Sequence, residues 1–521
     1  MKFIFILCFS FFNFFSANFT SKAAEKINIK FEEMSIPISI DELSRLDKLN
    51  QDSTEIIDWF RNNGLEKIFE LSKYLKFPIF KQDGFSKQIL RSWIGKKVLS
   101  ELSNTFIVPN DINGIQVFNT IEKLLEQKKE VSTIDILKTI PVKEIQLDVD
   151  NLIKIVSSWK KALEEQQTFT KKLKFLDNNE ENTSLIFNHN RDLDTKSYRI
   201  SLKAPHREEP LSLKIWMPEM NLKKDLIIFM PGLGGDINNF SWLGSGLSKK
   251  GWPVIFIEHQ GSDSVALNAS ITGDEALPGG ADIYLYRIKD LDFVINSYKQ
   301  GQLGFKNSSS YILMGHSLGA LISMLYEGNP PNNEFISRCE NALNDFALTN
   351  LSKLLQCQLS EIPIPEFEKS KELKAIVGFN SFGSLIWSNK KNSGIDVPIL
   401  FIGGTFDLIT PLISEQSKLF LANESNKLNR FLIIEGASHF SPIRVLNKNL
   451  SQMNGNDVFK IKEDFIGINP YKFQNLTLKI IIQFLIDFEK KGGLKLVQKQ
   501  NIDNLNFHIF GEKELKKILK N

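Results

Sequence analysis

The sequence predicts an α/β fold in which a mostly parallel sheet carries helices on both faces and follows a smaller, mainly helical domain. Three observations lead to this expectation. The second half of the chain alternates short β-prone apolar runs with helix-length segments. One of these runs leads directly into Gly315-His316-Ser317-Leu318-Gly319. A polar stretch separates this half from an amino-terminal part with helical periodicity.

Length and composition indicate a folded protein of more than one module. The chain has 521 residues, of which 42% are hydrophobic and 24% are charged. These proportions allow a large core and exclude a disordered chain or a small disulfide scaffold. The formal net charge is only +3, so nucleic acid is not an expected partner.

Residues 1–23 are typical of a secretory signal peptide. Met1-Lys2 is a short basic start, residues 3–15 are strongly apolar, and Ser21-Lys22-Ala23 places small residues around a cleavage site. The apolar run is shorter than the ~20 residues that span a bilayer. We therefore expect an exported protein, periplasmic or secreted, with retention of the signal as the alternative.

Residues 24–165 are expected to form the mainly helical N-terminal domain, whose role is unknown. A strand pair is an option at residues 27–31 and 36–40. Further on, Leu152, Ile155 and Trp159 recur at helical spacing, which is typical of a buried helix face. Residues 166–194 are rich in Lys, Glu and Asn, so they are expected to be an exposed linker.

Residues 195–490 are expected to hold the sheet, and the polar residues 491–521 a C-terminal tail. The β-prone runs lie at residues 198–202, 211–217, 226–230, 254–257, 311–314, 375–379, 399–402 and 431–434. Helix-length segments such as residues 282–298 separate many of them. Ligands of parallel sheets bind at the carboxyl ends of the strands, so the loops that leave these runs are the expected site.

The run Gly315-His316-Ser317-Leu318-Gly319 reads G-x-S-x-G between a strand signal and a helix signal. This order is that of a nucleophile elbow, in which a sharp turn presents a serine at the top of the sheet. The glycines are needed because side chains there would strike the neighbouring helix or strand. Ser317 is therefore the candidate nucleophile.

A serine hydroxyl needs a base to take its proton and an acid to orient that base. In elbow hydrolases the acid and then the histidine follow the serine along the chain. His439 follows the run at 431–434 directly, whereas His508 lies in the expected tail. Asp407 lies in a turn after the run at 399–402. We expect a Ser317, Asp407, His439 triad.

An acyl-transfer intermediate needs two backbone N–H groups to bind its oxyanion. The N–H of Leu318 comes directly after the nucleophile. The second is expected from Leu233 in Pro231-Gly232-Leu233-Gly234-Gly235, which follows the run at 226–230. Nucleotide binding by this loop is the alternative, but it lacks both G-x-G-x-x-G and a P-loop lysine.

Three further groups of residues carry weaker expectations. His259 comes before Ser317 in the chain, which is against the usual order for a general base. Arg287 and Asp290 are spaced for an ion pair on one helix face. No cluster of His, Cys and acidic residues has metal-ligand spacing, so neither a metal nor another cofactor is expected. Cys339 and Cys357 are an even pair in an oxidising compartment, which predicts a disulfide, with two buried thiols as the alternative.

An unusually long connection, residues 327–373, follows the nucleophile helix and is expected to be a lid insertion. Its apolar residues would favour a hydrophobic substrate, although they would equally close the insertion's own core. They are Phe335, Ile336, Leu343, Phe346, Leu348, Leu351, Leu354 and Leu355.

With these motifs in hand, residues 198–490 resemble the α/β-hydrolase superfamily. The resemblance is strongest to its branch of platelet-activating factor acetylhydrolases and dienelactone hydrolases, although the dienelactone enzymes use cysteine where this chain has Ser317. The amino-terminal region resembles an uncharacterised domain that precedes exported bacterial hydrolases. The motifs that carry the resemblance are Pro231-Gly232-Leu233-Gly234-Gly235, Ile257-Glu258-His259, Gly315-His316-Ser317-Leu318-Gly319 and Gly404-Thr405-Phe406-Asp407.

The resemblance implies an α/β-hydrolase fold and a serine hydrolase of carboxylic esters that works through an acyl-enzyme. A small-molecule or lipid ester is the expected substrate, and a peripheral membrane contact is left open. Thioesterase or peptidase activity is the alternative within the same chemistry. From another class, the alternative is a non-catalytic envelope binding protein that keeps the fold.

Overall fold

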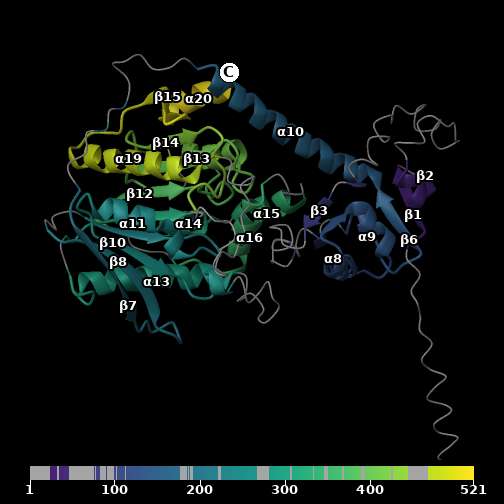
Figure 1. The fold of residues 1–521 in the computed structure, drawn as a ribbon, viewed down its shortest axis with the longest axis horizontal. Coiled ribbons are helices and arrows are strands. Elements are labelled where there is room, and N and C mark those ends of the chain that lie inside the picture. Colours follow the sequence, from purple (N-terminus) through teal and green to yellow (C-terminus); the bar gives the residue numbers. More distant parts are fainter. Residues whose placement is uncertain are drawn as a thin grey trace, which may run out of the picture. The chain divides into compact units, whose positions relative to one another are not determined.

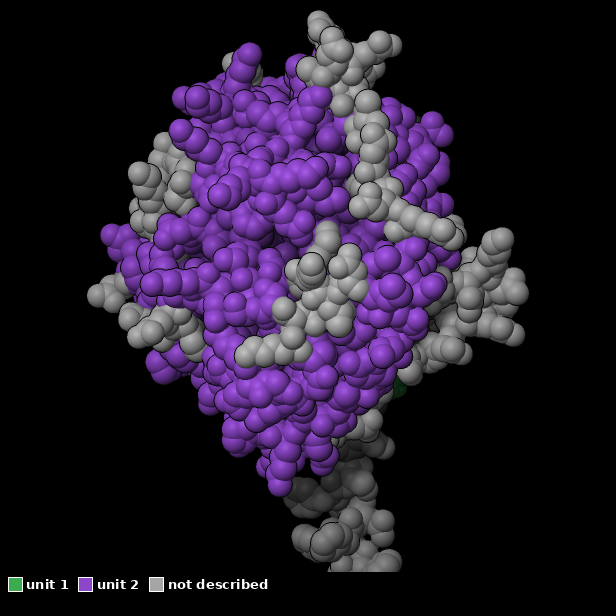
Figure 2. All heavy atoms as spheres, turned by 90° about the vertical axis from the view of Figure 1, so that its left-hand side faces the viewer, with its two compact units in different colours: residues 1–90, 95–154 green, residues 91–94, 155–521 purple. Residues whose placement is uncertain are grey.

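The computed structural model contains two compact units, coloured separately in Figure 2. The first unit comprises residues 1–90 and 95–154, and the second residues 91–94 and 155–521. Residues 1–23, which hold the expected signal peptide, lie outside the described residues. The described residues are 24–31, 34–45, 75–76, 78–81, 90, 99–100, 103–111, 113–176, 185, 187, 192–220, 225–266, 281–305, 308–332, 334–344, 350–365, 369–388, 394–423, 426–443 and 468–520.

The described part of the first unit is mixed α/β rather than mainly helical. Its four-stranded sheet has the order β2-β1-β6-β4, in which β1 pairs antiparallel with β2 and parallel with β6. The strand bounds are β1 (Lys26–Phe31), β2 (Met34–Ser39), β3 (Pro78–Lys81), β4 (Phe106–Ile107), β5 (Glu130–Ser132) and β6 (Glu144–Asp148). The helix bounds are α2 (Ile40–Leu43), α8 (Ile115–Gln127) and α9 (Thr133–Thr139).

The reason for this correction is an alternation of apolar and polar residues in short segments. Ile145 and Leu147 of β6 are buried while their neighbours are not, which is the period of a strand with one face in a core. They pack in one cluster with Ile27 of β1 and with Ile121 and Leu125 of α8. The unit therefore has its own hydrophobic core.

The predicted linker at residues 166–194 is wrong over its first part, because helix α10 (Val149–Lys174) continues through it. Phe169 and Leu173 are one helical turn apart and both are buried in the core of the second unit. These two apolar residues explain why a segment so rich in lysine and glutamate remains packed. In Figure 1, α10 is one uninterrupted helix.

The second unit is built on a ten-stranded sheet of the order β15-β16-β14-β13-β12-β11-β9-β10-β8-β7. The six strands from β10 to β14 in this order are parallel, and an antiparallel pair closes each edge. This confirms the mostly parallel sheet. The strand bounds are β7 (Thr195–Leu202), β8 (Leu211–Pro218), β9 (Leu226–Met230), β10 (Val254–Glu258), β11 (Tyr311–His316), β12 (Leu373–Phe379), β13 (Ile399–Gly404), β14 (Arg430–Ile434), β15 (Val497–Ile502) and β16 (Leu505–Phe510).

Helices cover both faces of this sheet. On one face α11 (Ser241–Ser248) and α19 (Pro470–Glu489) lie side by side (Figure 1). The other face carries α13 (Asp282–Lys299), α14 (Leu318–Glu327) and α17 (Lys418–Ala422), whose apolar residues share one core cluster. With helices on both faces, the loops at the strand ends are left to form a site.

Residues 491–521 were expected to form a polar tail, but they form the last edge of the sheet. Strand β16 pairs antiparallel with β14, and the chain ends in helix α20 (Glu512–Lys520). Phe507 and Ile509 are fully buried. Polar residues lie between the apolar ones of this segment, so its sequence does not show the apolar run of a strand. Asp503 and Asn504 join β15 to β16 with positive φ angles of 54° and 65°, which is the geometry of a tight hairpin turn.

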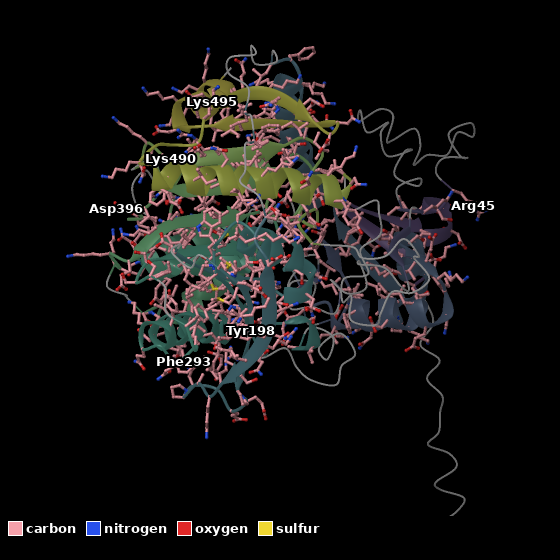
Figure 3. The ribbon with its side chains drawn as sticks, turned by 60° about the vertical axis from the view of Figure 1, so that its left-hand side comes forward. Arg45, Tyr198, Phe293, Asp396, Lys490 and Lys495 are labelled. Carbon is pink, nitrogen blue, oxygen red and sulfur yellow. A yellow bond between two sulfur atoms is a disulfide. The ribbon has the colours of Figure 1, made fainter. Side chains whose placement is uncertain are left out.

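The insertion at residues 327–373 folds into α15 (Glu334–Asn344), α16 (Ser352–Gln358) and the 3₁₀ turn η4 (Leu359–Glu361). Cys339 of α15 and Cys357 of α16 form a disulfide, drawn in yellow in Figure 3, with their Cα atoms 5.4 Å apart. Formation of this bond in solution stays a prediction.

The apolar residues of the insertion divide between the core and the solvent. Phe335 and Leu355 are buried in the same core cluster as the sheet, while the side chain of Ile336 is 53% exposed. Phe346 and Leu348 lie outside the described residues. Phe335 and Leu355 therefore help to close the core of the second unit.

Candidate active site

Ser317 lies in a sharp turn between strand β11 and helix α14. Its backbone has φ 52° and ψ −115°, a conformation that costs free energy in any residue with a side chain. The N–H of Ser317 donates to the carbonyl oxygen of Phe379 at the end of β12 (2.9 Å). The strained turn is thus held by the neighbouring strand and lifts the serine above the sheet.

The glycine at position 319 is explained by the close approach of α14 to strand β9. A Cβ atom on Gly319 would lie 2.0 Å from the carbonyl oxygen of Met230 and 2.8 Å from that of Pro231. No side chain fits at these distances. The elbow and the loop that follows β9 are therefore packed directly against each other.

His439 and Asp407 meet in the two loops that follow β14 and β13. The Nδ1 atom of His439 is 3.1 Å from Oδ2 and 3.2 Å from Oδ1 of Asp407. Both side chains are buried. In the tautomer that donates from Nδ1, Nε2 of the imidazole is left free to accept a proton.

Asp407 receives three further side-chain hydrogen bonds at Oδ2. The donors are Asn380 Nδ2 (2.7 Å), Thr410 Oγ1 (2.6 Å) and Gln416 Nε2 (3.0 Å). Burial by itself raises the pKa of Asp407, but the neighbouring His439 and the bonds from Thr410 outweigh it and lower the pKa below its usual value. The carboxyl group is therefore held ionised.

The three donors to Asp407 are the residues that the sequence interpretation missed. Thr410 follows Asp407 in the same turn and also donates its N–H to Oδ1 (2.8 Å). An aspartate that accepts the N–H of the third residue after it is a helix-cap pattern, so the sequence held a signal for Thr410. Gln416 points inward from η5 (Leu412–Ser417), a single π-helical turn of the kind frequent at functional sites. Asn380 is distant in sequence, so only the pairing of β12 with β13 brings it near.

His316 packs beneath the elbow and contacts His439. Its Nε2 is 3.0 Å from the carbonyl oxygen of His439, and the two imidazole centroids are 5.0 Å apart. Burial, with His439 close by, lowers the pKa of His316 to about 3. His316 is therefore neutral and donates from Nε2 to the backbone of His439.

The loop 231–235 lies beside Ser317. A Cβ atom on Gly232 would be 3.2 Å from Cβ of Ser317 and 2.9 Å from Nδ1 of His316. Among the described residues, the N–H groups of Leu233 and Leu318 have no backbone acceptor outside regular secondary structure. Both predicted oxyanion donors thus belong to segments that flank Ser317.

The structure brings Asp407 and His439 into contact, whereas among the described residues no hydrogen bond joins Ser317 Oγ to His439. His508 takes no part in this contact. It is buried in β16, where Nε2 lies 3.0 Å from Oε1 of Glu435.

The expected ion pair between Arg287 and Asp290 is wrong. Among the described residues, Asp290 pairs with Arg207, His206 and His259 instead. In the part of the chain that the structure describes, the Arg287 guanidinium donates its hydrogen bonds to oxygen atoms of Pro231, Gly232 and Ser262. The spacing of the two residues on α13 does not bring them together because partners from other loops compete for each.

Two kinds of feature are absent from the described residues. No group of three or more His, Cys, Asp and Glu side chains in this part of the chain could hold a metal ion. No helix within the described ranges is long and apolar enough to span a membrane.

Part of the first unit matches a known family. Residues 23–148 are similar to a family described as alpha/beta hydrolase of unknown function (DUF1400). This region precedes the ten-stranded sheet and the elbow. No curated protein matches the chain.

Proposed function

We propose that this chain is an exported serine hydrolase that cleaves carboxylic esters through an acyl-enzyme. The observation that carries the proposal is the contact of His439 Nδ1 with the buried, ionised Asp407 (3.1 Å), beside a strained elbow that presents Ser317. The similarity to an alpha/beta hydrolase family, the order of the strands and the resemblance of the motifs support the same α/β-hydrolase assignment. Export rests on the signal pattern of residues 1–23.

In the proposed mechanism His439 Nε2 takes the proton from Ser317 Oγ as the oxygen attacks the ester carbonyl carbon. Asp407 holds the imidazole in the required tautomer and stabilises its protonated form. The N–H groups of Leu233 and Leu318 bind the oxyanion of the tetrahedral intermediate. The carbon–oxygen bond to the alcohol then breaks, and His439 returns the proton to the leaving alcohol.

A water molecule completes the reaction. His439 takes a proton from this water, whose oxygen attacks the acyl carbon of the Ser317 ester. The bond to Ser317 Oγ breaks, the serine regains its proton from His439, and the free acid leaves. The same groups act twice, which is the logic of covalent catalysis by a serine triad.

We further propose that the substrate is a hydrophobic small-molecule or lipid ester, reached with or without a peripheral membrane contact. The insertion contacts the acid loop, because the N–H of Ser352 donates to the carbonyl oxygen of Ile409 (3.2 Å). The side chains of Phe406 and Leu408, on either side of Asp407, are 47% and 56% exposed. The two exposed apolar side chains beside Asp407 support a hydrophobic substrate.

Labelling with a fluorophosphonate probe tests the mechanism. The probe should modify the full-length protein, and Ser317→Ala should abolish both the label and the turnover of p-nitrophenyl butyrate. The matched control is Ser309→Ala, at an exposed serine two residues before β11, which should keep both.

The non-catalytic envelope binding protein is the competing outcome of this experiment. Absence of label on the folded wild-type protein would support it. Full turnover by Ser317→Ala would contradict the mechanism itself.

A further inference from the structure

Arg287 lies under the loop 231–235 and is completely buried. Its Nη1 donates to the carbonyl oxygen of Pro231 (2.6 Å) and its Nη2 to that of Gly232 (2.9 Å). Two more bonds go to Ser262, from Nη2 to the carbonyl oxygen (3.1 Å) and from Nε to Oγ (2.8 Å). Burial of a guanidinium costs free energy unless its donors are satisfied. Here the donors bind backbone carbonyl oxygens and the hydroxyl of Ser262.

The direction of these two carbonyl groups sets the direction of the N–H groups that follow them. All described peptide bonds are trans, so the carbonyl of one residue and the N–H of the next point in opposite directions. The carbonyl of Gly232 points toward Arg287 and also accepts the N–H of Gly235 (3.2 Å). The N–H of Leu233 consequently points away from Arg287.

The loop is also held from a neighbouring strand end. The N–H of Gly234 donates to the carbonyl oxygen of Ser262, in the loop that follows β10 (2.9 Å). Arg287 binds this same carbonyl and the Ser262 hydroxyl. One guanidinium therefore ties two loops together beside Ser317.

We propose that Arg287 is a positioning residue of the oxyanion hole, which clamps the Pro231 and Gly232 carbonyls so that the N–H of Leu233 faces the space above Ser317. This inference rests on the proposed hydrolase function. Arg287 does not touch the reacting atoms. It acts through the peptide groups that it orients, and its positive charge polarises those peptides toward stronger donation.

A buried carboxylate balances this charge. Asp290 lies one turn along α13 and receives bonds from His206, Arg207 and His259. Burial would raise the pKa of Asp290, but bonds from His259 and Arg207 outweigh it and hold the pKa well below its usual range. Burial lowers the pKa of Arg287 to about 9, which leaves it charged at neutral pH.

The experiment compares Arg287→Met and Arg287→Lys with the wild-type protein in three measurements. The first is kcat and KM for p-nitrophenyl butyrate. The second is the Ki of butylboronic acid, whose tetrahedral adduct on a serine places an oxygen in the oxyanion hole. The third is the Ki of butyrate, which forms no such adduct.

Loss of one oxyanion donor lowers kcat by roughly 10²–10³-fold, so loss of its alignment should lower it by roughly 10- to 100-fold. We expect KM and the butyrate Ki to stay within about threefold, while the butylboronic acid Ki rises in proportion to the fall in kcat. Lysine keeps the charge but offers a single point donor. The kcat and boronate Ki of Arg287→Lys should therefore lie between those of the wild type and of Arg287→Met.

Arg430→Met is the matched control, because Arg430 also binds backbone carbonyls, those of Leu494, Lys427 and Asn429, at the start of β14. This variant should lose thermal stability and keep kcat and the boronate Ki per folded molecule.

The clamp is overturned if folded Arg287→Met keeps its kcat and boronate Ki, or if boronate and butyrate lose affinity equally. Where Arg287→Met does not fold, the boronate-to-butyrate ratio of Arg287→Lys decides in the same way. Absence of a fluorophosphonate label on Ser317 would end the hydrolase proposal and this one together. A normal label with unaltered Arg287 variants would end the clamp alone.

Discussion

At the scale of single residues, Asp407 combines two roles that the sequence could not separate. Its Oδ1 accepts the N–H groups of Ile409 (2.9 Å) and Thr410 (2.8 Å), as a turn aspartate does. Its Oδ2 receives side-chain donors and faces His439. The turn bonds fix the carboxylate in place, so that the remaining oxygen can orient the imidazole.

A pH dependence of stability follows from His316. Its folded pKa of about 3 lies below the ordinary value of 6.5, so between these values the unfolded chain binds a proton that the folded chain does not. Stability from this group is present above pH 6.5 and is lost as the pH falls. The slope is at most about 1.4 kcal/mol per pH unit.

His316→Gln, which can still donate to the His439 carbonyl, should show a fall in unfolding temperature from pH 6.5 to 4.5 that is shallower than in the wild type. Comparing the two proteins matters because other groups titrate in the same window. His259, with its pKa lowered by burial to about 4, acts in the same sense. Glu327, with its pKa raised by burial to about 7, acts in the opposite sense. Parallel curves for the two proteins would contradict the assignment.

At the scale of elements, the strand that precedes His439 depends on the carboxyl-terminal hairpin. Strand β14 leads into the loop of His439, and β16 pairs with β14 from Phe431 to Ile434. Without β15 and β16, β14 would be an exposed edge strand with unpaired backbone groups. The segment that looked like a tail therefore supports the active-site loop.

Phe507→Ala tests this support. Phe507 is fully buried on β16, and truncation of a buried phenylalanine costs about 3–5 kcal/mol. The unfolding midpoint in urea should fall accordingly, and the labelled fraction should fall with it. Lys513→Ala, at an exposed position of α20, is the control and should change neither. A Phe507→Ala midpoint within error of the wild type would show that the hairpin is dispensable.

At the scale of the whole molecule, the two units differ in what they contain. The first unit has its own core and carries the family match at residues 23–148. The second has the ten-stranded sheet and every candidate catalytic residue. Helix α10 belongs to both by sequence, and its Gln166 donates to the carbonyl oxygen of Thr405 in the acid loop (2.8 Å). The substrate proposal concerns the second unit.

A series of p-nitrophenyl esters from acetyl to decanoyl tests the hydrophobic substrate. If the acyl chain is buried, kcat/KM should rise by up to about fourfold per added methylene, since each contributes roughly 0.8 kcal/mol. Phe406→Ser and Leu408→Ser should flatten this rise, because both expose apolar side chains beside Asp407.

Met220→Ser is the control for the ester series. Met220 is 75% exposed and follows β8. This strand runs antiparallel to its neighbour β10, so it ends beside the amino ends of the parallel strands and away from the candidate site. This variant should leave the rise intact. A wild-type enzyme that gains nothing from added methylenes would remove the lipid-like substrate from the proposal.

Local patterns were sufficient to predict the alternating strands and helices, the sharp turn at Ser317 and the position of His439 directly after a strand. These features depend on residues that are neighbours in the chain: an apolar run, glycines at a turn and a histidine directly after a strand. Errors arose where polar residues masked the pattern, as in the α10 extension and the β15–β16 hairpin.

The tertiary structure alone decided which polar groups meet. Asn380 and Gln416 reach Asp407 from separate loops, and Arg287 leaves its expected partner Asp290 for the carbonyls of Pro231 and Gly232. Spacing on one helix could not predict that exchange. A buried charge takes whichever donors or acceptors the packed loops bring within hydrogen-bond distance, and that is determined by the whole fold rather than by any segment of sequence.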